Sequence, residues 1–288
     1  PTPLSSPIRP LPTPSQPPSR FAVGNDFLQI VHHLPQRTRP VAHRVFHLRA
    51  EFCESPVLSI RHKQRIVTKP AASGHFLDQP SLDLLIHESC GHPTESDRVL
   101  EHEVAFAGTT FMWPKDRGTL RYGSEHVNMT ADATVPGGMG TFGWDDDGVA
   151  GTRTPLIERG IFTGYLRSRE TAGALGVARS GGAARAEGWQ HFPIVRMVNV
   201  SLEPGPHAYG ELLAEIDDGL LLESPASYSL DEKRQNFHFS AQVARVIRNG
   251  AIEGYVRGVG FQSLTPRFWG ACDGVADDWE LHGFTSCA

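Results

Sequence analysis

The pattern of apolar and polar positions from residue 81 onward predicts short strands joined by tight turns. Runs of β-branched and aromatic residues, or strict alternation, predict strands over residues 104–112, 125–134, 192–202 and 220–222. Two hairpins are expected. One spans residues 153–166, and the other joins residues 237–247 to 251–257 through Asn249-Gly250, a pair typical of a two-residue turn.

Helical periodicity is confined to a few stretches. Residues 81–92 predict a helix that Ser81 or Asp83 can cap, with Leu82, Leu85 and Ile86 as its apolar stripe. Three further helices are expected at 168–175, 207–218 and 265–269, and loops at 136–140, 180–188 and 275–288. Antiparallel strands and hairpins with a few outer helices predict an α+β fold.

The predicted helix at 81–92 delivers His87 next to Glu88, and His92 follows five residues after His87. Neutral imidazoles bind zinc well, and an adjacent carboxylate can accept a proton from water at the metal. On a regular helix this spacing separates the two side chains by roughly 140°. Both histidines can reach one metal only if the helix widens or ends between them, which Gly91 and Pro93 favour.

Composition argues against a nucleic-acid-binding, membrane or disulfide-rich protein. The chain has 288 residues and a net charge of -5, so no bulk attraction to nucleic acid is expected. No apolar run is long enough to span a bilayer, and no membrane association is expected. Four scattered cysteines do not form a disulfide framework, which favours a reducing, cytoplasmic location.

Residues 1–80 differ from the rest of the chain. They hold 13 of the 22 prolines and 6 of the 14 histidines, with ten Lys and Arg against four Asp and Glu. A disordered leader is the favoured interpretation. A basic, His-rich arm that binds metal or nucleic acid, and a stretch that is not native coding sequence, are the alternatives. We place no site there, and we expect the functional domain to span residues 81–288.

Two other motifs carry less weight. The glycine-rich segment 136–140 lacks the Lys-Ser/Thr and the strand-loop-helix context of a phosphate-binding loop. The run Asp145-Asp146-Asp147 lacks the alternate spacing of a calcium loop and is interpreted as an exposed acidic turn. Neither segment is expected to bind a ligand.

Several stretches together resemble the TldD/PmbA family of zinc metallopeptidases. They are IHESCGHPTESDR (86–98), YGSE (122–125), PGGMGTFGWDDDGV (136–149), RTPLIERGIFTGYL (153–166), EGW (187–189), RMVNVSLEP (196–204), DDGLLLE (217–223) and residues 269–273. The resemblance covers residues 81–288 in family order. The family's N-terminal region has no counterpart in residues 1–80, and the chain stops where the family sequence continues beyond Ser286-Cys287-Ala288. Because PmbA-type partners lack the His-Glu motif, the chain resembles the TldD side.

This resemblance implies that His87, His92 and a C-terminal cysteine bind Zn²⁺ and that Glu88 is catalytic. Cys287 is the expected third ligand, with Cys272 as the fallback. The resemblance also implies a preference for unfolded peptides and a dimer, either with a like chain or with a PmbA-type subunit. The expected function is therefore a zinc-dependent metallopeptidase. The alternative is a non-catalytic peptide-binding or partner subunit, or an inactive zinc-binding fragment.

Other polar residues have open assignments. Arg185 and Arg196 are candidates for holding a peptide carboxylate or carbonyl, and structural ion pairs explain them equally well. Glu95 either orients a metal ligand or is a solvated turn acid. Cys90 is expected to be a small packing residue.

Overall fold

The computed structural model describes residues 29–30, 66–68, 74–77 and 79–281. Its largest sheet runs in the order β1-β13-β11-β10-β3-β2-β14, with β12 paired to β11. These strands are β1 (Gln29–Ile30), β2 (Ile66–Thr68), β3 (Gly74–Leu77), β10 (Asp218–Leu230), β11 (Asn236–Arg248), β12 (Ala251–Val256), β13 (Gly260–Leu264) and β14 (Cys272–Val275). All its pairings are antiparallel except that of β3 with β10.

A second sheet has the order β6-β5-β4-β9, and a separate pair joins β7 to β8. These strands are β4 (Met129–Asp132), β5 (Arg153–Glu158), β6 (Ile161–Phe162), β7 (Ala184–Arg185), β8 (Ile194–Val195) and β9 (Asn199–Leu202). The α-helices are α1 (Gln79–Ile86), α2 (Ser96–Val99), α3 (Val104–Ala107), α4 (Arg169–Ala174), α5 (Tyr209–Ala214) and α6 (Thr265–Gly270). A π-helix (His87–Gly91) and two 3₁₀ turns (His92–Thr94 and Pro114–Asp116) complete the elements of the described chain.

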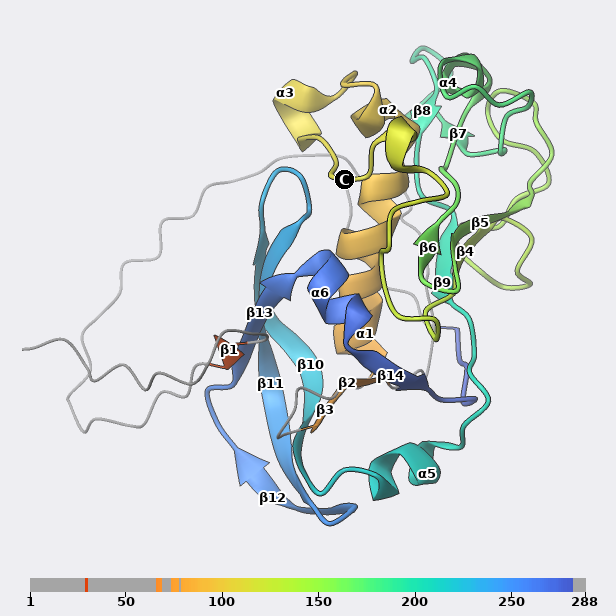
Figure 1. Ribbon diagram of the computed structural model, residues 1–288. Helices are drawn as coiled ribbons and strands as arrows, with labels where there is room; N and C mark the ends of the chain where they lie inside the picture. Colours follow the sequence, from red (N-terminus) through yellow and green to blue (C-terminus); the bar gives the residue numbers. More distant parts are fainter. Residues whose placement is uncertain (1–28, 31–65, 69–73, 78, 282–288) are drawn as a thin grey trace, which may run out of the picture.

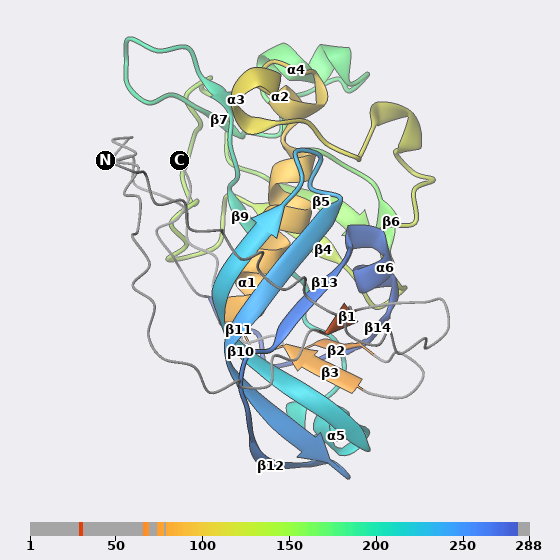
Figure 2. The ribbon, with the colours of Figure 1, turned by 90° about the vertical axis from the view of Figure 1, so that its left-hand side faces the viewer.

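Helix α1 lies at the centre of the fold. It packs against β10 on one side and approaches β9 of the second sheet on the other (Figure 1 and Figure 2). The predicted stripe of Leu82, Leu85 and Ile86 is completely buried. Each such side chain contributes about 1.5–3 kcal/mol by leaving water. The core between the two sheets therefore fixes the helix that leads directly into the histidine motif.

Most of the predicted architecture is confirmed, including the α+β class. Both hairpins are present, and each turn has two residues with positive φ: 47° and 74° at Arg159-Gly160, and 46° and 77° at Asn249-Gly250. Such φ values match the twist of the flanking strands. Ser168 caps α4, and Gly176, with a φ of 67°, follows the helix end as expected. No helix in the described part of the chain has the length and apolar character needed to cross a bilayer.

The strand predicted over residues 104–112 is wrong. Residues Val104–Ala107 form α3, and Gly108, with a φ of 76°, turns the chain out of the helix. Beyond it, the N–H groups of Thr109 and Phe111 donate to the carbonyls of Glu232 and Lys233 at 3.0 and 3.2 Å. The apolar composition therefore reflects an irregular segment that packs on the turn between β10 and β11, a long-range contact that no local pattern contains.

Four other predictions needed correction. The strand expected over 192–202 is interrupted and forms β8 and β9, and the loop expected at 180–188 contains β7. The helix expected over 207–218 shrinks to α5, because Asp218 already begins β10. The expected strand 125–134 is reduced to β4.

Three short strands come from the predicted leader. The described residues of β1, β2 and β3 pair with the large sheet, so they are part of the fold. The remainder of residues 1–80, apart from the start of α1, lies outside the described chain. Its assignment as a leader stays a prediction.

The π-helix that follows α1 has an unusual hydrogen-bond pattern with clear causes. The N–H of His92 donates to the carbonyl of His87, five residues earlier. Pro93 has no N–H to offer Ser89, and the hydroxyl of Tyr122 donates to the Ser89 carbonyl instead, at 3.1 Å. The hydroxyl of Thr94 bonds the carbonyls of Cys90 and Gly91 at 2.8 and 2.9 Å. The widening that Gly91 and Pro93 favoured is therefore present, and the carbonyls of Ser89, Cys90 and Gly91 have partners.

Gly91 gives the first testable prediction. A Cβ at this position would lie 2.1 Å from Sδ of Met197, whereas a Cβ at Gly173 in α4 would meet no atom within 4 Å. Gly91→Ala should lower the melting temperature, because the π-helix or Met197 must shift. Gly173→Ala should leave it unchanged or raise it, since alanine is favoured over glycine in helices by about 1 kcal/mol. Thermal unfolding followed by circular dichroism measures both, and equal effects would contradict the close contact.

Candidate metal centre

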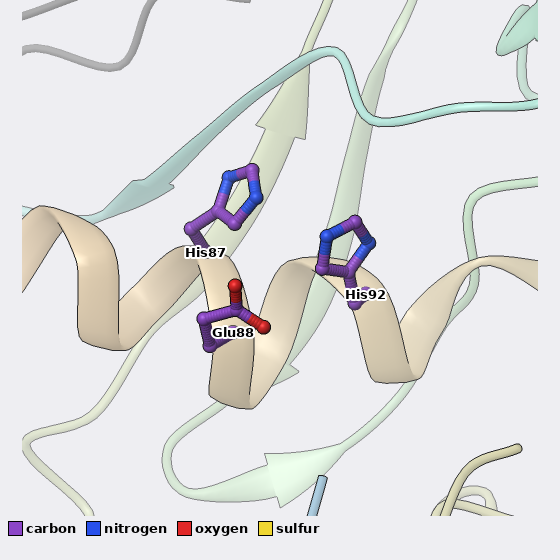
Figure 3. Close-up of side chains that lie close together, drawn as sticks. All are labelled: His87, Glu88 and His92. Carbon is purple, nitrogen blue, oxygen red and sulfur yellow. The ribbon is translucent and has the colours of Figure 1, made fainter. Parts of the chain in front are cut away.

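His87, Glu88 and His92 converge at the π-helix. One potential ligand atom from each lies within 4.8 Å of the others. Their exposed fractions are only 2%, 5% and 5%. In Figure 3 the Glu88 carboxylate lies below the His87 ring and to the lower left of the His92 ring. Among the described residues, these three side chains form the one group of His, Cys, Asp or Glu that comes close enough to share a metal ion.

The π-helix accounts for this convergence. The ring centroids of His87 and His92 are 4.6 Å apart, with the rings at 81° to one another. A regular helix would turn side chains five residues apart by roughly 140°. The wider turn carries His92 back toward the side occupied by His87, which makes a shared ligand geometrically possible.

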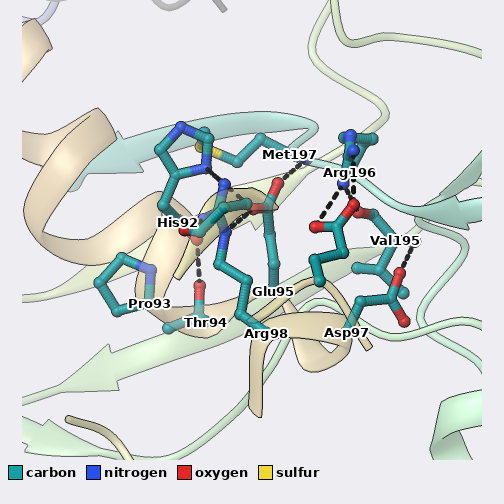
Figure 4. A network of polar contacts seen from close by, with 12 residues as sticks. His92, Pro93, Thr94, Glu95, Asp97, Arg98, Val195, Arg196 and Met197 are labelled. Atoms are coloured by element: carbon teal, nitrogen blue, oxygen red, sulfur yellow. Dashed lines mark hydrogen bonds and ion pairs between the residues drawn. The ribbon is translucent and has the colours of Figure 1, made fainter. Parts of the chain in front are cut away.

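Glu95 fixes the orientation of His92. Its Oε2 lies 2.8 Å from Nδ1 of His92 and accepts from Nε of Arg98 at 2.7 Å. Its Oε1 accepts from the N–H of Met197 at 3.1 Å, and the side chain is fully buried (Figure 4). Burial raises the pKa of Glu95, but His92 and Arg98 outweigh burial and hold this pKa well below its usual range.

The ionised Glu95 determines which nitrogen of His92 can bind a metal. A carboxylate can only accept, so its contact with Nδ1 of His92 favours the tautomer in which Nδ1 carries the proton, and Nη2 of Arg98 also lies 3.0 Å from this nitrogen. In that tautomer Nε2 is the nitrogen that can bind a metal. Carboxylate–histidine pairs of this kind commonly support zinc sites. Glu95 is therefore a buried partner of His92, and the interpretation as a solvated turn acid is wrong.

His87 is held neutral by its surroundings. Burial and the neighbouring His92 lower the pKa of His87 well below its usual value, and Arg234 and Arg98 act in the same direction. A neutral imidazole keeps a lone pair at pH 7. Two buried imidazoles beside a carboxylate fit the donor chemistry that zinc prefers.

Glu88 has a partner that the sequence did not reveal. Nη1 of Arg234, in the turn between β10 and β11, forms an ion pair with Oε2 of Glu88. The two residues are 146 positions apart. No spacing or motif connects them, and only the packing of the β10–β11 turn over the π-helix brings them together.

The two candidate arginines have different environments. Arg196 donates to both carboxylate oxygens of Glu103, at 2.8 and 3.1 Å. This contact supports a structural ion pair for Arg196 over a contact with the peptide. Arg185 lies in β7 and pairs with Ile194 of β8, the strand that ends directly before Arg196. A substrate-binding role for Arg185 stays a prediction.

The cysteines also differ. Cys287 lies outside the described residues, so its role as third ligand stays a prediction. Cys272 is buried in β14, donates to the carbonyl of Gly274 at 3.5 Å, and is absent from the group formed by the two histidines and Glu88. Burial raises the pKa of Cys272 to about 12. Cys90 packs in the hydrophobic core, as expected.

Comparison with known proteins identifies the family. The model of the PmbA/TldA metallopeptidase C-terminal domain matches residues 75–288. The chain belongs to the TldD/PmbA family. A metalloprotease of Methanocaldococcus jannaschii is 37% identical over 216 residues, which cover 74% of this chain and 46% of that protein. A zinc metalloprotease TldD homolog of Saccharolobus solfataricus is 26% identical over 199 residues, covering 69% of this chain and 42% of that protein.

The fold of this TldD/PmbA chain also matches a solved structure. TldE from Thermococcus kodakarensis superposes with a TM-score of 0.57 at 17% identity, covering 80% of this chain and 52% of that one. At this identity the likeness shows the fold alone. The chain spans about half the length of the relatives it matches.

The contact between Glu95 and His92 yields a second prediction. Glu95→Gln removes the charge that fixes the His92 tautomer, and zinc affinity should fall by about 10–100-fold. Glu125→Gln, at a carboxylate whose side chain is 67% exposed, is the control and should bind zinc like the unmodified chain. Competition with a chelator of known affinity measures both. Equal zinc affinity for the two variants would show that Glu95 does not support the site.

Proposed function

We propose that this chain carries the metal-binding and proton-transfer site of a zinc-dependent metallopeptidase that acts on unfolded or extended peptides. The observation that carries this proposal is the convergence of His87, Glu88 and His92 within 4.8 Å in a buried widened helix. Membership of a metallopeptidase family and relatives named as metalloproteases support it.

The residues for holding zinc follow from the donor geometry. Nε2 of His92 and a ring nitrogen of the neutral His87 would bind the ion, with Cys287 as the proposed third ligand. Bound zinc would polarise a peptide carbonyl and lower the pKa of water in the fourth position. The burial of the site strengthens every electrostatic interaction within it.

Glu88 would transfer the proton. We propose that its carboxylate accepts the proton of the attacking water and passes it to the leaving amine. Its place beside the two imidazoles suits this role (Figure 3). General acid–base catalysis of this kind contributes about 10²–10⁴-fold to the rate.

An extended peptide would bind as an added strand. Main-chain hydrogen bonds at a strand edge favour unfolded segments over folded proteins. The segment that contains β8 lies close to the candidate site, because the N–H of Met197, two residues after β8, donates to Glu95, the partner of His92. The N–H of Val195 in β8 donates to Asp97. Arg185 in β7 is our candidate for a contact with a peptide carboxylate or carbonyl.

Assembly is part of the same proposal. We propose a dimer with a like chain or with a PmbA-type subunit. The alternative, a zinc-binding or peptide-binding subunit without catalysis, is an outcome of the test below: one zinc per chain without turnover would support it.

Substitution of Glu88 tests the catalytic role. Glu88→Gln should keep one zinc per chain and lose cleavage of an unfolded peptide by at least about 100-fold, because an amide cannot accept the proton. Glu253→Gln, at an exposed carboxylate in β12, is the matched control and should cleave normally. Metal analysis and peptide cleavage by mass spectrometry measure both. Undiminished cleavage by the Glu88 variant would refute its role.

Substitution of the cysteines tests the third ligand. Cys287→Ser should lower zinc affinity by more than about 10-fold, since a direct ligand matters at least as much as its supporting partners. Cys272→Ala should leave zinc affinity unchanged, because Cys272 is absent from the cluster of potential ligands. Chelator competition distinguishes them, and the reverse result would identify Cys272 as the ligand.

A further inference from the structure

Arg234 occupies a conformation that is costly for an arginine. Its φ is 62°, in the left-handed region that favours glycine and asparagine. In addition, Nε of Arg234 is buried and has no hydrogen-bond partner in the described part of the chain. Glycine would relieve the backbone and remove the orphaned donor. A costly conformation that the surroundings maintain is a common feature of functional sites.

The turn that carries Arg234 is built to hold this conformation. The N–H of Arg234 donates to the carbonyl of Asp231 at 3.0 Å. Oδ1 of Asp231 accepts from the N–H groups of Gln235 and Asn236 at 2.7 and 3.2 Å. The carbonyl of Arg234 accepts from the hydroxyl of Thr265 at 2.9 Å. The arginine is therefore fixed at its backbone from both sides.

The same turn is tied to the far end of the histidine motif. The segment Thr109–Phe111 donates to two carbonyls of the turn, and the hydroxyl of Thr110 donates to the carbonyl of Pro93 at 2.8 Å. A Cβ on Gly108 would lie 2.4 Å from the carbonyl oxygen of Glu232, so this junction is closely packed. The segment Thr109–Phe111 therefore constrains the distance between the Arg234 backbone and the π-helix, in addition to the ion pair between Arg234 and Glu88.

The guanidinium pairs through Nη1 with Oε2 of Glu88. Glu88 is 5% exposed, and the Arg234 side chain is 20% exposed. The other oxygen of Glu88 is not engaged by Arg234. A carboxylate held through one oxygen keeps a fixed direction while the second oxygen remains available for a proton.

We propose that Arg234 is the positioning residue of this site, which holds the Glu88 carboxylate beside the two imidazoles. This inference rests on the proposed peptidase function. It gives a reason for an arginine at a position where glycine would be less strained. Its role is to act through Glu88, and zinc binding by His87 and His92 does not require it.

The test compares Arg234→Gln and Arg234→Lys in the full chain with Lys233→Gln, an exposed cation of the same turn. Arg234→Gln should lower kcat about 100-fold, the effect expected of a misplaced catalytic group, with KM and zinc affinity within about threefold. Arg234→Lys should restore kcat to within about tenfold, because an ammonium can also pair with Glu88. Lys233→Gln should match the unmodified chain.

A double-mutant cycle separates positioning from a purely structural role. If Arg234 acts through Glu88, adding Arg234→Gln to Glu88→Gln should not lower the residual rate further. In the zinc-free chain, the decrease in melting temperature of the double variant should be smaller than the sum of the decreases of the two single variants. Normal kcat in Arg234→Gln, or an equal loss of rate with and without Glu88, would overturn the proposal.

Failure of the peptidase function gives a different result. A zinc-loaded unmodified chain that cleaves no peptide would refute the peptidase function. The positioning role of Arg234 would then be tested by a crystal structure of the zinc-loaded Arg234→Gln variant. Movement of the Glu88 carboxylate away from the imidazoles supports the positioning role, and an unmoved carboxylate contradicts it.

Discussion

The hydrogen bond from the N–H of His92 to the carbonyl of His87 is the interaction on which the site depends. It widens one turn of the helix and brings two imidazoles five residues apart into edge contact. A π turn is rare and needs support from its surroundings. Here Tyr122 and Thr94 satisfy its carbonyls, and the absence of a side chain on Gly91 leaves room for Met197.

A layer of buried charges then connects this turn to both sheets. Glu95 joins His92 to Arg98 and to the backbone of Met197, just before β9. From the other side, Arg234 extends from the β10–β11 turn to Glu88. Removing one partner of a buried pair leaves an uncompensated charge, which is strongly unfavourable. The orientation of the proposed ligands and base is therefore a property of the whole fold.

The sequence contained the local part of this arrangement. The spacing of His87 and His92, with Gly91 and Pro93 nearby, predicted a widened or ending helix because backbone chemistry acts within a few residues. Asn249-Gly250 predicted its hairpin for the same reason. The non-local part was not accessible. Residues 104–112 have strand-like composition, yet Gly108 and the contacts with Glu232 and Lys233 determine their path.

The same distinction applies to the site. Glu95 is three residues from His92, so a contact was foreseeable, but its complete burial depends on distant packing. Arg234 lies 146 residues from Glu88 and belongs to a turn with no recognisable motif. Charged pairs between distant segments depend on the fold, and a single sequence does not show which of many arginines meets which carboxylate.

A crystal structure of the zinc-loaded chain, with anomalous diffraction recorded at the zinc absorption edge, shows directly whether His87 and His92 share a zinc ion. We expect one anomalous peak about 2.0–2.1 Å from a ring nitrogen of His87 and from Nε2 of His92, the usual zinc–imidazole distance. Glu95 should remain on Nδ1 of His92. A peak elsewhere in the molecule, or two imidazoles that point away from a shared ion, would contradict it.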